Sequence, residues 1–290
     1  MNGAIPKRPL GSTGEMVSLL TVGGFHIGLP SDFEVGVQII RTAIDNGVNF
    51  LDNACCYHGG KSEEIMGRAL KEGYREKVVL MTKNHGRDYE TFKRHLELSL
   101  TRLQVDCIDV VQFHEVIEEG MPERLFKDGA VDAAVEARKE GKIRFIGFTG
   151  HKKPSIFLDM LQRNFKWDTV QLPVSVLDYH FRSFTQEIIP ILVERKIGVI
   201  GMKSLAGGNA IRTGTLKAEE CVRYSMSLPV STVVVGMESL NLLKKHLKVA
   251  ATFSEMSETE KSELLQRSEP FGERGEYEPY KTTKHYDSGL

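Results

Sequence analysis

The side chains best suited to chemistry stand at the ends of short apolar runs. Asp52, Lys83 and His114 each follow such a run, and Tyr57 stands five residues beyond Asp52. An ammonium close to a phenol favours the phenolate and lowers the phenol's pKa from about 10, while a carboxylate keeps that ammonium charged and oriented. A histidine nearby can donate a hydrogen bond to a carbonyl oxygen that the tyrosine then protonates. The four residues therefore predict a catalytic set for carbonyl reduction, with a nicotinamide cofactor supplying the hydride.

Each of these residues also has an ordinary structural interpretation. An isolated aspartate often braces a turn, an isolated lysine reaches solvent, and an isolated histidine is more often a core residue than a catalytic one. A tyrosine in a loop is commonly a surface aromatic. The chemical interpretation gains weight if the chain brings all four residues to one place, because buried polar groups without partners are costly.

For these side chains to meet, the apolar runs before them must be strands of one sheet. The runs are rich in Val and Ile and apolar almost throughout, which is typical of parallel strands covered on both faces. They alternate with segments in which apolar residues recur at helical spacing. Eight such units predict an α/β fold of the (β/α)8 TIM barrel class, in which the carboxyl ends of the strands converge on one mouth.

The predicted elements follow this alternation along the chain. The eight strands are expected at residues 18–22, 49–51, 78–81, 108–113, 145–148, 169–172, 198–201 and 232–235. The helices are expected at residues 32–46, 62–71, 89–103, 131–140, 155–163, 186–195, 219–227 and 240–250, with a further helix at 257–266. Turn residues 11–14 predict an opening β-hairpin within residues 1–17, and residues 271–290, which show no periodicity, predict a long irregular tail. We expect one domain over residues 1–290.

Composition and charge exclude several classes of partner. Thirty-eight Lys and Arg residues stand against 39 Asp and Glu residues, so the formal net charge of −1 gives no long-range attraction to nucleic acid or to an anionic membrane. No apolar run approaches the ~18 residues of a membrane span, and residues 1–10 lack the apolar run of a signal peptide. The four cysteines show no metal or disulfide spacing, which is typical of a reducing compartment. We expect a cytoplasmic protein without a metal site.

The segment around Tyr57 carries a family resemblance. Residues 52–59 read Asp-Asn-Ala-Cys-Cys-Tyr-His-Gly, and Ser62-Glu63 follow closely. This stretch resembles the signature segment of the aldo-keto reductases, and Lys83 and His114 match the lysine and histidine positions of that family. The resemblance implies that Asp52, Tyr57, Lys83 and His114 are its catalytic tetrad. It also implies a barrel in which residues 254–290 supply an extra helix and a C-terminal loop over the mouth.

The same resemblance implies an extended nicotinamide dinucleotide across the barrel mouth, held without a G-x-G-x-x-G fingerprint, which the chain lacks. Several positions depart from the family pattern: Gly150 replaces an asparagine and Met202 an aromatic residue. Gly236 and Glu238 stand where basic residues would meet a 2′-phosphate, and His246 stands where the family often has an asparagine near the adenine. An acidic residue suits a ribose hydroxyl better than a phosphate. We therefore expect NADP(H) to be preferred, with NAD(H) possible. The residues assigned to the cofactor are Gly24, Thr149, Gly150, His151, Gln171, Met202, Lys203, Ser204, Leu205, Gly207, Gly236, Glu238, Ser239, Lys245 and His246.

The expected substrate is a small aldehyde or ketone, or the alcohol in the reverse direction, and loops beyond the strands would contact it. This set comprises Phe25, His26, His58, His85, Glu115, Tyr277 and Tyr280, with the loop at residues 115–127 also facing the mouth. The oligomeric state is not readable from the sequence.

Two other functions are compatible with a barrel of this kind. His26, His58, His85, His114 and His151 follow the first five predicted strands, which suggests a metal-dependent hydrolase, but neither a His-x-His pair nor an HExxH motif is present. The second alternative is a sensor or accessory subunit that binds a nicotinamide cofactor with little turnover. The presence of all four tetrad residue types favours the enzyme.

Overall fold

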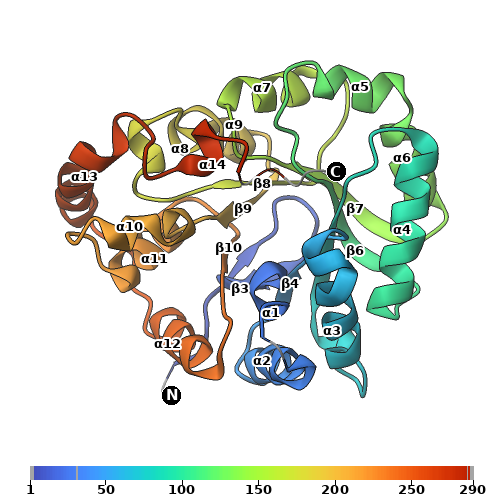
Figure 1. The fold of residues 1–290 in the computed structure, drawn as a ribbon, viewed down its shortest axis with the longest axis horizontal. Helices are drawn as coiled ribbons and strands as arrows, with labels where there is room; N and C mark the ends of the chain where they lie inside the picture. Colours follow the sequence, from blue (N-terminus) through green and yellow to red (C-terminus); the bar gives the residue numbers. More distant parts are fainter. Residues whose placement is uncertain (1–2, 31, 286, 288–290) are drawn as a thin grey trace.

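A closed barrel of eight parallel strands forms the centre of the molecule (Figure 1), in a computed structural model that describes residues 3–30, 32–285 and 287. The strand order around the barrel is β10-β3-β4-β5-β6-β7-β8-β9, so each strand pairs with its neighbour in the chain and β10 closes against β3. The predicted TIM barrel is confirmed. The strands are β3 (Leu20–Gly23), β4 (Phe50–Asp52), β5 (Val79–Asn84), β6 (Ile108–Phe113), β7 (Ile143–Thr149), β8 (Thr169–Pro173), β9 (Gly198–Met202) and β10 (Thr232–Val235).

Helices surround the barrel and bury the outer faces of its strands, which explains why the strands are apolar on both faces (Figure 1). The helices between successive strands are α1 (Gly24–Ile27), α2 (Phe33–Asp45), α3 (Lys61–Ala69), α4 (Tyr89–Leu103), α5 (Met121–Lys127), α6 (Ala130–Lys139), α7 (Pro154–Gln162), α8 (Phe184–Glu187), α9 (Ile189–Glu194), α10 (Asn209–Arg212) and α11 (Ala218–Ser227). After the last strand come α12 (Leu240–Ala251), α13 (Glu258–Gly272) and α14 (Pro279–Thr282).

The opening hairpin closes the end of the barrel at which the strands begin. Strands β1 (Lys7–Pro9) and β2 (Met16–Ser18) pair antiparallel, as predicted. Leu10 and Val17 of this hairpin join the barrel interior in one apolar cluster with Phe50, Val79, Met81, Val110 and Ile200. The hairpin turn lies tightly against β9: at Gly11, whose φ is +56°, a Cβ atom would stand 2.3 Å from the Gly198 nitrogen. The opposite end, where the strands finish, is left as the mouth.

Several predicted elements differ from the structure in extent or kind. The helix expected at 186–195 is two short helices, α8 and α9, because Pro190 lacks the amide hydrogen that a continuous helix needs. Part of the loop expected at 115–127 is the helix α5, and α13 runs to Gly272 rather than ending at residue 266. The tail at 271–290 contains the short helix α14, while residues 286 and 288–290 of that prediction lie outside the described residues.

The C-terminal segment is fixed to the barrel by a buried cluster of charges. Lys281 Nζ lies 2.6 Å from Asp178 Oδ1 and 2.9 Å from Glu278 Oε2, and both the ammonium and its two carboxylate partners are almost completely buried. Glu278 Oε1 also accepts hydrogen bonds from Ser175 and Tyr280. These bonds explain how a polar stretch without periodicity takes up a defined position. Among the described residues, no helix is both long and apolar enough to cross a membrane.

Candidate active site

The four predicted catalytic residues converge at the mouth of the barrel. Asp52 ends β4, Lys83 is the penultimate residue of β5, His114 follows β6, and Tyr57 begins a short 3-10 turn after β4. The Lys83 ammonium contacts the Asp52 carboxylate and donates to the Asn53 carbonyl oxygen at 2.7 Å. It also lies 3.5 Å from the Tyr57 hydroxyl oxygen. One buried cation thus links the carboxylate to the phenol.

The loop that carries Tyr57 is held by buried polar bonds. Asn53 Nδ2 donates to the Ser62 carbonyl oxygen at 2.9 Å, and Asn53 Oδ1 accepts from the Ala54 amide at 2.9 Å. Glu63, which is fully buried, accepts from Thr82 Oγ1 at 2.7 Å. The Asn53–Ser62 bond joins the two ends of the loop, and the Glu63–Thr82 bond ties its end to β5. The phenol is consequently presented on a rigid support, which a proton donor requires.

His114 lies across the mouth from Tyr57, with ring centroids 5.6 Å apart and the rings nearly perpendicular. Its Nδ1 is 3.6 Å from Cys56 Sγ, and the same sulfur is 3.1 Å from His85 Nε2. The two histidine rings are 4.3 Å apart. Three loops therefore bring a thiol and two imidazoles together beside the phenol.

Burial sets the direction of the pKa shifts at this site. It raises the pKa of Tyr57 well above its usual value, and Asp52 and Cys56 add to the effect. The expectation that Lys83 lowers this pKa on balance is therefore wrong, because desolvation of the phenolate outweighs the effect of the nearby cation. Burial likewise lowers the pKa of His114 well below its usual value. At neutral pH the site holds a phenol and an uncharged imidazole, and both can donate a hydrogen.

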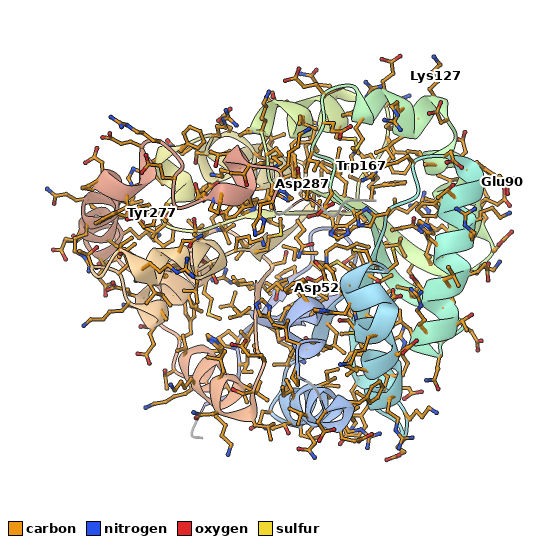
Figure 2. All side chains as sticks on the ribbon, viewed as in Figure 1. Asp52, Glu90, Lys127, Trp167, Tyr277 and Asp287 are labelled. Carbon is orange, nitrogen blue, oxygen red and sulfur yellow. The ribbon has the colours of Figure 1, made fainter. Side chains whose placement is uncertain are left out.

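A cavity of about 860 Å³ opens over these residues. Tyr57, Lys83 and His114 line it, whereas Asp52 lies behind Lys83. Figure 2 shows Asp52 inside the ring of helices and Asp287 of the C-terminal segment close to the same central region. His285 and Asp287 line the cavity, so the segment that follows α13 reaches the mouth as expected. Other predicted residues along its wall are Phe25, His26, His58, Glu115, Thr149, His151, Met202, Lys203 and Gly207.

Comparison with known proteins agrees with this geometry. Residues 19–220 match the model of the aldo/keto reductase family. The chain belongs to the aldo/keto reductase family. It is 32% identical to the L-galactose dehydrogenase of Arabidopsis thaliana over 70% of its own length and 66% of that relative, so it spans just under two thirds of the relative's length.

Solved structures of aldo-keto reductases share the fold of this family member. One is the holo form of aldo-keto reductase AKR11C1 from Bacillus halodurans, with a TM-score of 0.76 and 23% identity, covering 91% of this chain and 96% of that one. Another is an aldo/keto reductase from Klebsiella pneumoniae in complex with NADP and acetate, with a TM-score of 0.73 and 20% identity, covering 89% and 94%. At these identities the likeness concerns the fold.

Beside the predicted tetrad of this aldo/keto reductase, β7 and β8 present two of the residues assigned to the cofactor. Thr149 and Gln171 are register partners on these adjacent strands. Gln171 Nε2 donates to Asp52 Oδ2 at 3.2 Å, while its Oε1 is buried and has no hydrogen-bond partner in the described part of the chain. At Gly150, a Cβ atom would stand 2.4 Å from the Val116 carbonyl oxygen, so close packing explains the glycine that replaces the family's asparagine.

The loop after β9 combines a half-buried cation with left-handed backbone. Lys203 adopts φ of +61°, its ammonium lies 5.5 Å from the centre of the Tyr280 ring, and burial lowers its pKa. Gly207 and Gly208 adopt φ of +68° and +91°, a region that glycine occupies without strain. The predicted cofactor residues Ser204 and Leu205 are buried and partly buried, respectively, and Leu205 packs against the core. Backbone groups rather than these two side chains are therefore the candidates for an anion contact.

The loop after β10 lies against His26. A Cβ atom at Gly236 would stand 2.5 Å from the His26 ring, so the absence of a side chain at this position leaves room for the histidine ring. Ser239 accepts from the Leu242 amide at 3.2 Å and caps α12. Glu238 is exposed, and its charge acts on His26 and on buried His246, opposing the lowering of their pKa values by burial. Lys245, also expected here, is exposed.

Several predicted residues lie outside the cavity wall. Tyr280 is fully buried and donates to Glu278. Its ring faces the Lys203 ammonium and does not line the cavity. Tyr277 packs on Phe271 and lies beside α13 at the edge of the molecule (Figure 2). These positions correct their assignment as substrate contacts. His85 lies behind Cys56, and at Gly24 a Cβ atom would stand 2.6 Å from Asn53 Oδ1, so packing alone requires that glycine.

Several residues of the cavity wall were not among the predicted site residues. His95, Leu98 and Arg102 project from one face of α4, where their spacing of three and four residues was a usable signal. Nothing in the sequence, however, directs that face to the mouth. Asp287 lies 2.7 Å from Lys152 Nζ and 3.3 Å from His151 Nε2. Such a pairing between distant segments leaves no local pattern.

Proposed function

We propose that this protein reduces a small aldehyde or ketone to the alcohol with hydride from NAD(P)H, and that Tyr57 donates the proton. The observation that carries the proposal is the chain of contacts from Asp52 through Lys83 to the Tyr57 hydroxyl, which lines a cavity at the barrel mouth. Family membership supports the same reaction class.

The residues at the mouth fit a nicotinamide cofactor. The partnerless Gln171 Oε1 would accept from the amide nitrogen of the carboxamide, and the Thr149 side chain on the adjacent strand would bind the same group. Met202, which lines the cavity, would pack against the nicotinamide ring. Bound NAD(P)H supplies the hydride. The structure from Klebsiella pneumoniae is a complex with NADP, which supports NADP(H) as the preferred cofactor.

The chain's own residues perform the proton chemistry. Tyr57 stays protonated at neutral pH because burial raises its pKa, so its hydroxyl holds the proton that the developing alkoxide requires. Uncharged His114 would donate a hydrogen bond to the carbonyl oxygen and orient it toward Tyr57. In the reverse direction Tyr57 acts as the base, and Lys83 would stabilise the phenolate that forms.

A polar carbonyl compound is the substrate class that the cavity favours. Its wall combines the aromatic Phe25 with polar His58, Glu115 and Arg102, which offer hydrogen-bonding groups to a hydroxylated substrate. The name of the Arabidopsis relative, L-galactose dehydrogenase, also supports a sugar-derived compound. Tyr277 and Tyr280 have no part in this binding, because neither lines the cavity.

Oxidation of NADPH and NADH with a panel of carbonyl compounds tests the proposal. The panel contains sugar-derived aldehydes, aromatic aldehydes, ketones and quinones, and the absorbance of the reduced cofactor gives the rate. We expect reduction with at least one class and a higher kcat/KM with NADPH. Calorimetric binding of NADPH without turnover on any compound would support the sensor alternative instead.

A further inference from the structure

Three side chains beside the catalytic tyrosine are arranged as metal ligands. Cys56 follows β4, His85 follows β5 and His114 follows β6, and one ligand atom from each lies within 4.8 Å of the other two. Cys56 Sγ is 3.1 Å from His85 Nε2 and 3.6 Å from His114 Nδ1. Because the residues come from three separate loops, they show no metal spacing in the sequence, and a metal site was not expected.

Two of the three distances between ligand atoms suit one tetrahedral ion, and the third, between the two ring nitrogens, is at most 4.8 Å. With Zn–S of about 2.3 Å and Zn–N of about 2.0–2.1 Å, tetrahedral angles place a sulfur and a nitrogen ligand about 3.6 Å apart. The Cys56–His114 edge already has this length, and the Cys56–His85 edge needs an opening of about half an ångström, well within side-chain adjustment. Three protein ligands leave a fourth position open, which is the pattern of zinc sites that also bind water or another small ligand.

The donor set selects the kind of ion. One thiolate and two imidazoles suit Zn²⁺ and other soft or borderline ions, whereas Mg²⁺ and Ca²⁺ prefer oxygen ligands. Both imidazole rings are buried, and each places a ring nitrogen within 4.8 Å of the other two ligand atoms. When the metal binds, the S–H bond of Cys56 breaks, a Zn–S bond forms, and the proton leaves to solvent.

We propose that Cys56, His85 and His114 form a Zn²⁺ site whose occupation inhibits the reductase. Cys56 and His114 line the cavity, so an ion reaches the site through the barrel mouth. The bound ion engages the histidine that would orient the carbonyl and lies beside Tyr57, so it obstructs substrate binding. The inhibition rests on the proposed function, whereas the binding of the ion does not.

Metal binding to the full chain is measured first, without cofactor or substrate. Equilibrium dialysis against Zn²⁺ gives the stoichiometry and affinity, and Co²⁺ serves as a spectroscopic probe because thiolate ligation produces a strong near-ultraviolet charge-transfer band. We expect one ion per chain and a thiolate band in the wild type. Cys56→Ala should weaken Zn²⁺ binding by at least about tenfold and abolish the band, because it removes one of three ligands.

Cys55→Ala is the matched control. Cys55 is adjacent, is also half-buried, and lines the same cavity, but its thiol is not part of the ligand group. We expect this variant to bind Zn²⁺ like the wild type. Less than one ion per chain in the wild type, or equal losses in the two variants, would overturn the site.

The second measurement is inhibition of NAD(P)H oxidation by Zn²⁺, expressed relative to each variant's own uninhibited rate. We expect Zn²⁺ to compete with the carbonyl substrate and the inhibition constant to rise at least about tenfold in Cys56→Ala but not in Cys55→Ala. Inhibition that is equal in both variants would overturn the inhibitory role even where dialysis shows the ion bound. An enzyme without measurable reduction would leave the dialysis result as the decisive test, so failure of the proposed function stays distinguishable.

Discussion

The Lys83 ammonium lies 3.5 Å from the Tyr57 hydroxyl oxygen while it contacts the Asp52 carboxylate. Burial raises the pKa of the phenol above its usual value, and the Asp52 charge adds to that effect. A phenol that stays protonated is the form required for reduction, whereas a phenolate is required for oxidation of an alcohol. The same contact has a different consequence for each direction of the reaction.

Replacing Tyr57 by phenylalanine tests the proton donor. Tyr57→Phe keeps the aromatic ring and removes only the hydroxyl, so turnover should fall by about 10² or more, the usual scale of acid catalysis. NADPH affinity should stay within about twofold of the wild type, because the hydroxyl has no part in cofactor binding. Steady-state reduction rates and calorimetric titration with NADPH measure the two quantities. Near-normal turnover would refute the role.

Lys83→Met tests the electrostatic link. The rate of alcohol oxidation should rise with pH as Tyr57 forms the phenolate, and removal of the cation makes that form less favourable, so the rise should move to higher pH. A displacement of the profile by one pH unit corresponds to a loss of about 1.36 kcal/mol in the stabilisation of the phenolate. Lys83→Arg, which keeps the charge, should displace the profile less.

The loss of Lys83 also leaves the buried Asp52 carboxylate without its cation. Removal of one partner of a buried ion pair costs about 3–5 kcal/mol of folding stability. The double variant Asp52→Asn/Lys83→Met should recover much of that stability in urea denaturation and keep the displaced pH profile. A profile equal to that of the wild type in the folded double variant would show that Lys83 acts only through structure.

His114→Ala should impair the handling of the carbonyl compound more than that of the cofactor. The uncharged ring lies across the mouth from Tyr57, so its removal should raise KM for the carbonyl compound and lower kcat. The dissociation constant for NADPH should change by less than about threefold. If cofactor affinity fell as much as turnover, His114 would belong to the cofactor site.

Lys281→Met should release the C-terminal segment from the barrel. The substitution leaves Asp178 and Glu278 buried without their shared cation, at a cost of about 3–5 kcal/mol. Limited proteolysis should then cleave the segment after α13 sooner, because its anchor is lost. Lys284→Met, at an exposed position in the same segment, is the control and should behave like the wild type. Equal protection in both variants would mean that other contacts hold the segment.

The barrel could be predicted because each strand is a short apolar run that is recognisable in the sequence on its own. The meeting of Asp52, Lys83 and His114 could also be predicted, since residues at the ends of parallel strands converge at one mouth. Both predictions depend on short runs of residues that are adjacent in the sequence.

Features that depend on contacts between distant segments could not be predicted from such short runs. The direction of the Tyr57 pKa shift depends on burial by the completed fold, and the sequence shows only the neighbouring cation. Tyr280 belongs to the C-terminal segment and carries a hydroxyl, which suggested a contact with the substrate. In the structure that hydroxyl donates a hydrogen bond to buried Glu278 instead. The grouping of Cys56 with His85 likewise appears only when two loops are placed side by side.

The choice between the two cofactors depends on the loop after β10. Glu238 is exposed, yet its charge acts on both His26 and His246, which places the carboxylate within electrostatic reach of the two histidines. Lys245 is exposed nearby on α12 and acts on His246 as well. A 2′-phosphate in this region would therefore meet charges of both signs. We expect NADPH to be preferred, with appreciable use of NADH.

Glu238→Arg should shift this preference further toward NADPH. The substitution removes a carboxylate that would repel the 2′-phosphate and supplies a guanidinium that can bind it in a charge-assisted contact. The ratio of kcat/KM for NADPH to that for NADH should rise by about tenfold or more, since a hydrogen bond to a charged group contributes about 1.5–3 kcal/mol. Glu238→Gln is the matched variant: it removes only the repulsion, so it should produce a smaller shift in the same direction. An unchanged ratio in both variants would show that Glu238 faces away from the adenosine site, and strict dependence on NADH in the wild type would contradict the preference itself.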